Sequence, residues 1–162
     1  MKRRLLLSGG AAALLAGCGF QLRKAPDFVF DSIRVNGGTA VATQLRRNLA
    51  ADGSVQVLGP GDPGDVQVVL DLRQEQRERV VVGINASGQV REYQLRLRVT
   101  FRLLTPQGRE LIPDTELLQQ RDISFNESAV LAKEGEETLL YRDMQNDIVQ
   151  QLMRRLAALR AL

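Results

Sequence analysis

The segment VREYQLRLRVTFRLL (residues 90–104) alternates between apolar and polar side chains along most of its length. Successive side chains of a β-strand point to opposite faces, so every second residue shares a face. The apolar face is expected to hold Tyr93, Leu95, Leu97, Val99, Phe101 and Leu103, and the polar face Gln94, Arg96, Arg98, Thr100 and Arg102. We therefore predict a long strand with one face in a core and the other in contact with water or a polar partner.

A second long β candidate, DVQVVLDLRQEQRERVVV (residues 65–82), precedes this strand. The residues between them include Asn85, Ser87 and Gly88, which are typical of a tight turn, so the two segments are predicted to form a long hairpin. Shorter strands are expected within residues 28–35, 55–58 and 115–125.

Two segments carry the spacing of amphipathic helices. The first is capped by Thr39 and ends at Asp52-Gly53, and its apolar stripe is Val41, Leu45 and Leu49. The second lies near the C-terminus, with a stripe of Leu140, Met144, Ile148, Leu152 and Leu156. Both stripes need an apolar surface to cover. The predicted fold is an α+β two-layer sandwich, with two α-helices packed on one face of a mostly antiparallel β-sheet of about four strands.

The N-terminus has the pattern of a secretory signal. Lys2, Arg3 and Arg4 precede an uncharged run from residue 5 to residue 17, which is too short to span a membrane. The run ends in Leu15-Ala16-Gly17-Cys18, which resembles the lipobox of bacterial lipoproteins. We expect residues 1–17 to be a signal peptide that is removed, residues 18–27 a lipidated tether, and residues 28–162 a single domain.

Cys18 is the only cysteine of the chain, so no disulfide can form within it. The lipobox resemblance implies that its sulfur receives a diacylglycerol and that its new amino group is acylated. The alternative is a buried free cysteine in an apolar N-terminus. Several acyl chains anchor a protein stably. In lipoproteins, an aspartate directly after the cysteine usually marks retention in the inner membrane. Because this chain has Gly19 at that position, the resemblance implies the outer membrane. Beyond this covalent lipid, we expect no cofactor.

Composition excludes several classes of function. The 22 Lys and Arg residues include three in the signal, which leaves 19 against 19 Asp and Glu, so the mature chain carries no formal net charge. With balanced charge and no aromatic residues interleaved among the arginines, nucleic acid is not an expected partner. The chain has no histidine. We therefore expect no metal site and no Ser-His or Cys-His catalysis.

Four segments together resemble the LptE family of lipopolysaccharide-assembly lipoproteins. They are CGFQLR at the mature start, GQVREYQLRLRVTFRL, RDISFNESAVLAKEGEETLL and DIVQQLMRRL. The resemblance implies a non-catalytic outer-membrane lipoprotein that plugs the lumen of the LptD β-barrel and assists its assembly. It also implies binding of lipopolysaccharide on its way to the outer leaflet.

The resemblance further implies which cations bind lipopolysaccharide. In the family, basic residues near the hairpin tip and before the last helix are implicated. Lys133 matches the second position. At the first position this chain has Asn85-Ala86-Ser87, so Arg91, just past Gly88, is the nearest substitute. Arg96 and Arg98 continue along the strand. The alternatives are a solvated Lys133 offsetting Glu134, and arginines on the wet face of a sheet.

Two other classes of function stay open. A lipoprotein adaptor of another outer-membrane assembly machine would share the anchor and a small α+β domain. An enzyme would need an acid–base pair, for which Asp114 and Glu116 are the candidates. Because no nucleophile or metal-ligand pattern accompanies these carboxylates, we expect no catalysis.

Overall fold

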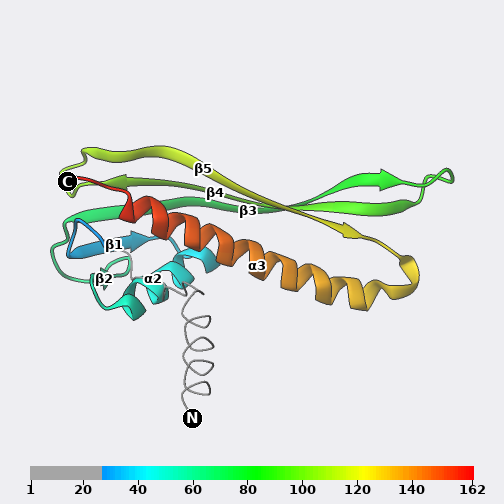
Figure 1. Ribbon diagram of the computed structural model, residues 1–162, viewed down its shortest axis with the longest axis horizontal. Coiled ribbons are helices and arrows are strands. Elements are labelled where there is room, and N and C mark those ends of the chain that lie inside the picture. The colour runs from blue at the N-terminus through cyan, green and yellow to red at the C-terminus, as the bar shows by residue number, and fades with distance from the viewer. Residues whose placement is uncertain (1–26) are drawn as a thin grey trace, which may run out of the picture.

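The computed structural model describes residues 27–162, which form one sheet covered by two helices on the same face (Figure 1). The strands are β1 (Ser32–Asn36), β2 (Gln56–Leu58), β3 (Val68–Ile84), β4 (Val90–Leu104) and β5 (Glu110–Ser124). The helices are α2 (Ala40–Asp52), the short 3-10 turn η1 (Glu127–Ala129) and α3 (Val130–Ala157). The predicted two-layer α+β architecture is confirmed. Cys18 and the signal segment lie outside the described residues.

The sheet has the strand order β2-β1-β3-β4-β5. Strand β1 runs parallel to both β2 and β3, whereas β3, β4 and β5 form an antiparallel meander. The expectation of about four mostly antiparallel strands is therefore corrected to a mixed sheet of five. Parallel neighbours need a crossover connection, and α2 supplies it between β1 and β2.

Strand β4 has the predicted alternation. Leu95, Leu97, Val99, Phe101 and Leu103 are all buried beneath the helices. On the same face, α2 contributes Val41, Leu45 and Leu49, and α3 contributes Met144, Ile148, Leu152 and Leu156. Of the predicted α3 stripe, only Leu140 is partly rather than fully buried. The core thus lies between the sheet and the two helices.

Strand β3 departs from strict alternation at Arg73. Leu72 pairs with Phe101 and Gln74 with Thr100, so Arg73 is the extra residue of a β-bulge. Before the bulge, Val68, Leu70 and Leu72 face the core. After it, Glu75, Arg77 and Arg79 pair with Val99, Leu97 and Leu95 of β4. Charged side chains thus enter the helix-covered face of the sheet.

Helix α2 begins as predicted. The Oγ1 atom of Thr39 accepts the backbone N–H of Ala42 at 3.2 Å, and Gly53 ends the helix with φ of +74°. A second donor of the first turn, the N–H of Val41, is bound at 3.1 Å by a carboxylate oxygen of Glu75. The bulge in β3 therefore also places the carboxylate of Glu75 at the N-terminus of α2.

Helix α3 is the longest helix and runs back along the sheet from the hairpin end (Figure 1). Its 28 residues begin at Val130, and Arg154 and Arg155 lie in its last turn, where the helix dipole favours cations. Within residues 27–162, no helix combines the length and apolar character needed to cross a membrane.

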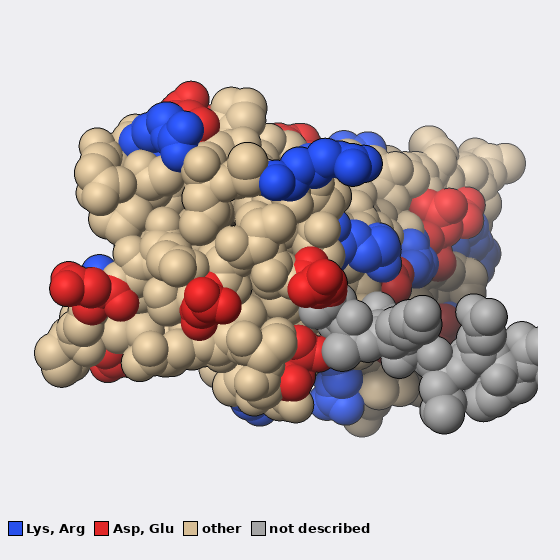
Figure 2. All heavy atoms as spheres, turned by 60° about the vertical axis from the view of Figure 1, so that its left-hand side comes forward, with Lys and Arg blue, Asp and Glu red and all other residues tan. Residues whose placement is uncertain are grey.

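Acidic and basic side chains are interspersed on the surface shown in Figure 2. Among the described residues, no broad field of one sign is visible on this face. The view agrees with the balanced charge of the mature sequence and offers no long cationic track of the kind that follows a nucleic-acid backbone.

Candidate functional site

The end of the molecule that holds the β3–β4 hairpin is the first candidate site. The hairpin extends past the end of β5 and the start of α3 (Figure 1). Its turn is closed by a 3.0 Å hydrogen bond from the N–H of Gly88 to the carbonyl of Asn85, and Gly88 has φ of +80°. We call this end, formed by the hairpin, the end of β5 and the first turns of α3, the tip.

Lys133 lies in the first turn of α3 and is held by two contacts. Its Nζ atom donates to the hydroxyl of Ser124 at 2.9 Å and to a carboxylate oxygen of Glu136 at 2.8 Å. The predicted alternative partner was Glu134, but the observed ion pair is with Glu136. Lys133 is thus a positioned cation, and a ligand anion would compete with Glu136 for it.

Next to Lys133 is a cavity of about 150 Å³ between α3 and the sheet. Arg79 lies across it, with its guanidinium 4.8 Å from the ring centre of Tyr93 and 3.2 Å from a carboxylate oxygen of Glu137. Phe125 meets Tyr93 edge to face at 5.2 Å. Cations and aromatic surface therefore lie together in this cavity.

Apolar residues surround the same end. Of the nine large hydrophobic residues that are exposed in the described chain, five belong to the tip: Val81, Val82, Ile84, Val130 and Leu131. Ile84 is 65% exposed and Leu131 84% exposed. Exposed apolar side chains gathered at one end of a domain are typical of a binding surface.

Arg91 is also at the tip, although it lines a different cavity from Lys133. It is the extra residue of a bulge in β4, since Val90 pairs with Ile84 and Glu92 with Gly83. Its carbonyl accepts the N–H of Phe125 at 2.7 Å, which ties the hairpin to the segment entering α3. Its exposed side chain lines a small cavity of about 90 Å³.

Arg96 and Arg98 lie on the opposite face of the sheet from the helices. Arg98 contacts Glu116 at 2.5 Å and Glu78 at 3.9 Å. The hydrogen bond to Glu116 and its negative charge raise the pKa of Arg98. Arg96 donates to the side chain of Gln94 at 2.9 Å. The four predicted cations therefore do not form one patch.

The carboxylates considered for catalysis are both paired with arginines. Asp114 contacts Arg73 at 2.8 Å, and Glu116 contacts Arg98. Across the described chain, no three Asp, Glu, His or Cys side chains come together in a way that could hold a metal ion. The two carboxylates are thus parts of surface ion pairs.

The sequence analysis did not predict that Arg77 and Arg79 lie on the helix-covered face of the sheet. Arg77 lies 5.1 Å from the ring centre of Tyr141, whose hydroxyl donates to the carbonyl of Glu78 at 2.8 Å. Burial, and then the charge of Glu137, raises the pKa of Tyr141. The only available signal was the loss of apolar alternation after Leu72, which indicates an irregularity but not its position.

Sequence comparison places this chain among lipopolysaccharide-assembly lipoproteins. The family model of LptE, described as lipopolysaccharide-assembly, matches residues 26–156. The LPS-assembly lipoprotein LptE of Pectobacterium atrosepticum is 30% identical, covering 96% of this chain and 86% of the relative. That of Yersinia enterocolitica is 27% identical, covering 97% and 76%.

Solved structures share the fold. An uncharacterized lipoprotein B from Nitrosomonas europaea superposes with a TM-score of 0.73 and 30% identity, covering 86% of this chain and 91% of that one. The rare lipoprotein B of Shewanella oneidensis, at 24% identity, gives a TM-score of 0.65 over 78% and 94%. With the family model spanning nearly the whole described domain, the chain belongs to the LptE family of lipopolysaccharide-assembly proteins.

Proposed function

We propose that this protein binds lipopolysaccharide at its tip and plugs the lumen of an LptD β-barrel, which it also helps to assemble, without catalysing a reaction. Family membership supports the role in lipopolysaccharide assembly. The single observation that carries the binding site is the meeting of positioned cations with exposed apolar side chains at one end of the domain.

Lipopolysaccharide combines phosphates with acyl chains, and the tip offers a partner for each. Lys133 and Arg91 are the proposed phosphate contacts, and the exposed Val82, Ile84 and Leu131 are the proposed acyl contacts. Lys133 would exchange Glu136 for phosphate, which carries more charge. Arg96 and Arg98 are weaker candidates for contact with lipopolysaccharide, because Arg98 would first have to break its ion pairs with Glu78 and Glu116.

The shape and polarity of the domain support the plug. Strand β4 has 15 residues and is therefore about 50 Å long, compared with about 25 Å for the apolar band of an outer-membrane barrel. The uncovered sheet face carries paired charges, Arg98 with Glu116 and Arg102 with Asp71. Such a self-compensated polar face suits a water-filled barrel interior.

The lipid on Cys18 is the proposed anchor to the outer membrane, on its periplasmic side. Recognition of the barrel is proposed to rest on the folded domain. We therefore expect Cys18→Ala, exported to the periplasm by a cleavable signal, still to recover the barrel in a pull-down. Loss of the barrel from a correctly exported variant would contradict this expectation.

The first experiment is a membrane pull-down of the tagged lipoprotein, with its major partner identified by mass. A stoichiometric large β-barrel identified as LptD supports the proposal. Recovery with a different outer-membrane machine would support the adaptor alternative, and recovery of the protein alone would remove the transport role.

The second experiment measures lipopolysaccharide binding by single variants. Lys133→Gln and Arg91→Gln should each weaken binding about tenfold, the effect of losing one charge-assisted hydrogen bond. Glu136→Gln should strengthen binding, because it removes the competitor for Lys133. Arg160→Gln, exposed at the far end of the chain, is the matched control. Equal affinities for all four variants would contradict the tip site.

A further inference from the structure

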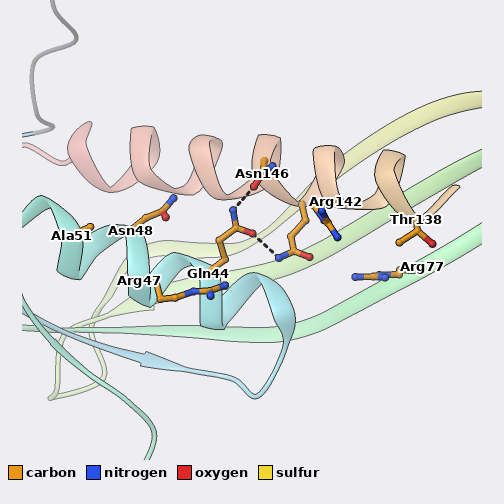
Figure 3. A pocket seen from close by; sticks show the side chains of 9 residues that line it. Gln44, Arg47, Asn48, Ala51, Arg77, Thr138, Arg142 and Asn146 are labelled. Carbon is orange, nitrogen blue, oxygen red and sulfur yellow. Dashed lines mark hydrogen bonds between the residues drawn. The ribbon is translucent and has the colours of Figure 1, made fainter. Parts of the chain in front are cut away.

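A second hollow lies away from the tip, between α2, α3 and the middle of β3. It has a volume of about 620 Å³ and is open to solvent. Figure 3 shows its side chains entering the space from both helices and from the strand. Its lining consists of Gln44, Arg47, Asn48, Ala51, Arg77, Thr138, Arg142, Gln145 and Asn146. We call it the interhelical groove.

The lining of the interhelical groove is cationic, and no carboxylate belongs to it in the described part of the chain. It has three guanidinium groups, from Arg47, Arg77 and Arg142. Within the described part of the chain, Arg47 and Arg142 form no ion pair or hydrogen bond through their side chains. Arg77 has one distant carboxylate, Glu75 at 3.7 Å. An anion entering the groove would therefore meet little competition.

Apart from Thr138, carboxamides form the rest of the polar lining, and those of Gln44, Gln145 and Asn146 are ordered by hydrogen bonds. The Nε2 atom of Gln44 donates to Asn146, which joins α2 to α3 (Figure 3). Gln145 donates to the side-chain oxygen of Gln44 at 2.6 Å and to the carbonyl of Ala40 at 3.3 Å. These three carboxamides are thus held in place before any ligand binds, which lowers their ordering cost on binding.

We propose that the interhelical groove is a binding site for a phosphorylated saccharide. Guanidinium groups bind phosphate oxygens through paired hydrogen bonds. Carboxamides and the hydroxyl of Thr138 both donate and accept, so they can pair with sugar hydroxyls, which do the same. Among the residues that the structure describes, no aromatic ring lines the groove, so bases of a nucleic acid would find no stacking surface there.

The interhelical groove is connected to the tip through a third cavity of about 480 Å³. That cavity shares Arg77 and Thr138 with the groove, and it shares Arg79, Glu134 and Glu137 with the cavity next to Lys133. Along α3, Arg142 is nine residues from Lys133, a rise of about 14 Å. A single amphiphile could contact the tip with its acyl chains and the groove with its sugars. Identification of the ligand as the saccharide of lipopolysaccharide rests on the proposed function.

The test is calorimetric titration of the full-length lipoprotein in detergent with three probes. They are lipid-free phosphorylated core oligosaccharide, the same oligosaccharide after removal of its phosphates, and inorganic phosphate. The variant is Arg47→Gln with Arg142→Gln. Its matched control is Arg154→Gln with Arg160→Gln, which removes the same charge from exposed positions outside the groove.

The phosphorylated oligosaccharide should bind the parent protein and the control equally. The groove variant should bind it at least about tenfold more weakly, since each lost charge-assisted hydrogen bond weakens binding about tenfold. Undiminished binding by the groove variant would overturn the site. Equal affinity for the dephosphorylated oligosaccharide would overturn the role of phosphate, and equal affinity for inorganic phosphate would overturn the role of the sugar.

The tip and the interhelical groove can fail separately. Lys133→Gln should weaken binding of intact lipopolysaccharide and leave binding of the lipid-free oligosaccharide unchanged. Arginine-dependent oligosaccharide binding by a protein that recovers no barrel, with binding of intact lipopolysaccharide unchanged by Lys133→Gln, would support the groove while overturning the proposed function.

Discussion

Replacing Glu75 by alanine should destabilise the protein because this side chain holds the start of α2. Glu75 belongs to β3, just beyond the bulge at Arg73, and faces the helices. Its carboxylate accepts the N–H of Val41 at 3.1 Å. This N–H is one of the first-turn donors that has no partner within the helix. The variant therefore removes a charged cap supplied by a different element.

The magnitude follows from the burial of Glu75. Its side chain is only 9% exposed, so water screens the interaction little. A hydrogen bond to a charged group contributes about 1.5–3 kcal/mol, and a carboxylate near a helix N-terminus adds about 0.3–1 kcal/mol. We expect Glu75→Ala to lower the free energy of unfolding by about 2–3 kcal/mol. Glu75→Gln retains an acceptor and should cost about 1 kcal/mol.

The assay is urea denaturation followed by circular dichroism, because urea does not screen charges. Glu78→Ala is the matched control on the same strand. Glu78 faces the other side of the sheet and contacts Arg98 at 3.9 Å, with 27% of its side chain exposed. Losing such a surface pair should cost less than about 1 kcal/mol.

Hydrogen exchange gives a local readout. The Val41 amide should exchange at least about tenfold faster in Glu75→Ala, because a loss of about 1.4 kcal/mol in local protection corresponds to a factor of ten. A Val41 amide with unchanged protection, or equal costs for Glu75→Ala and Glu78→Ala, would refute the capping role of Glu75.

Three further predictions concern stability and are checked by the same urea denaturation. Burial and the charge of Glu137 raise the pKa of Tyr141, so the folded state holds the phenol proton more tightly than the unfolded chain, and stability should fall as pH rises above about 10. Tyr141→Phe should remove this alkaline fall. At pH 7 the variant should cost about 1 kcal/mol, because it loses the 2.8 Å hydrogen bond to the backbone carbonyl of Glu78. A Tyr141→Phe curve that keeps the alkaline fall would contradict this assignment. Leu97→Ala should cost about 3–5 kcal/mol, since Leu97 is 0% exposed at the centre of the sheet and the variant leaves a cavity there. A cost below about 1 kcal/mol would contradict this and mean that the core closes around the cavity. Gly37→Ala should cost about 1–3 kcal/mol, because Gly37 has φ of +126° and an added Cβ would lie 3.1 Å from the backbone oxygen of Leu72. An unchanged unfolding midpoint would contradict this expectation and show that the turn can adapt.

Elements whose pattern is local were predictable from the sequence. The alternation along residues 90–104 predicted the buried face of β4, and Thr39 and Gly53 predicted the ends of α2. The apolar stripe of α3 was visible for the same reason, because helical and strand periods are set by backbone geometry alone. Lys133 is a candidate only through family resemblance, because the local pattern alone would have left it as one solvated lysine.

Features that depend on contacts between distant segments required the tertiary structure. The bulge at Arg73 turns Glu75, Arg77 and Arg79 toward the helices, and strict alternation from Leu72 predicts the opposite face for them. A shift of one residue reverses every following side chain of a strand. Likewise, the pairing of Arg98 with Glu78 and Glu116 depends on the register of three strands. The sequence by itself determined the periods of the elements and the types of side chain available. Only the packing of segments far apart in the chain decided which cations are paired and which of them meet in the tip and the interhelical groove.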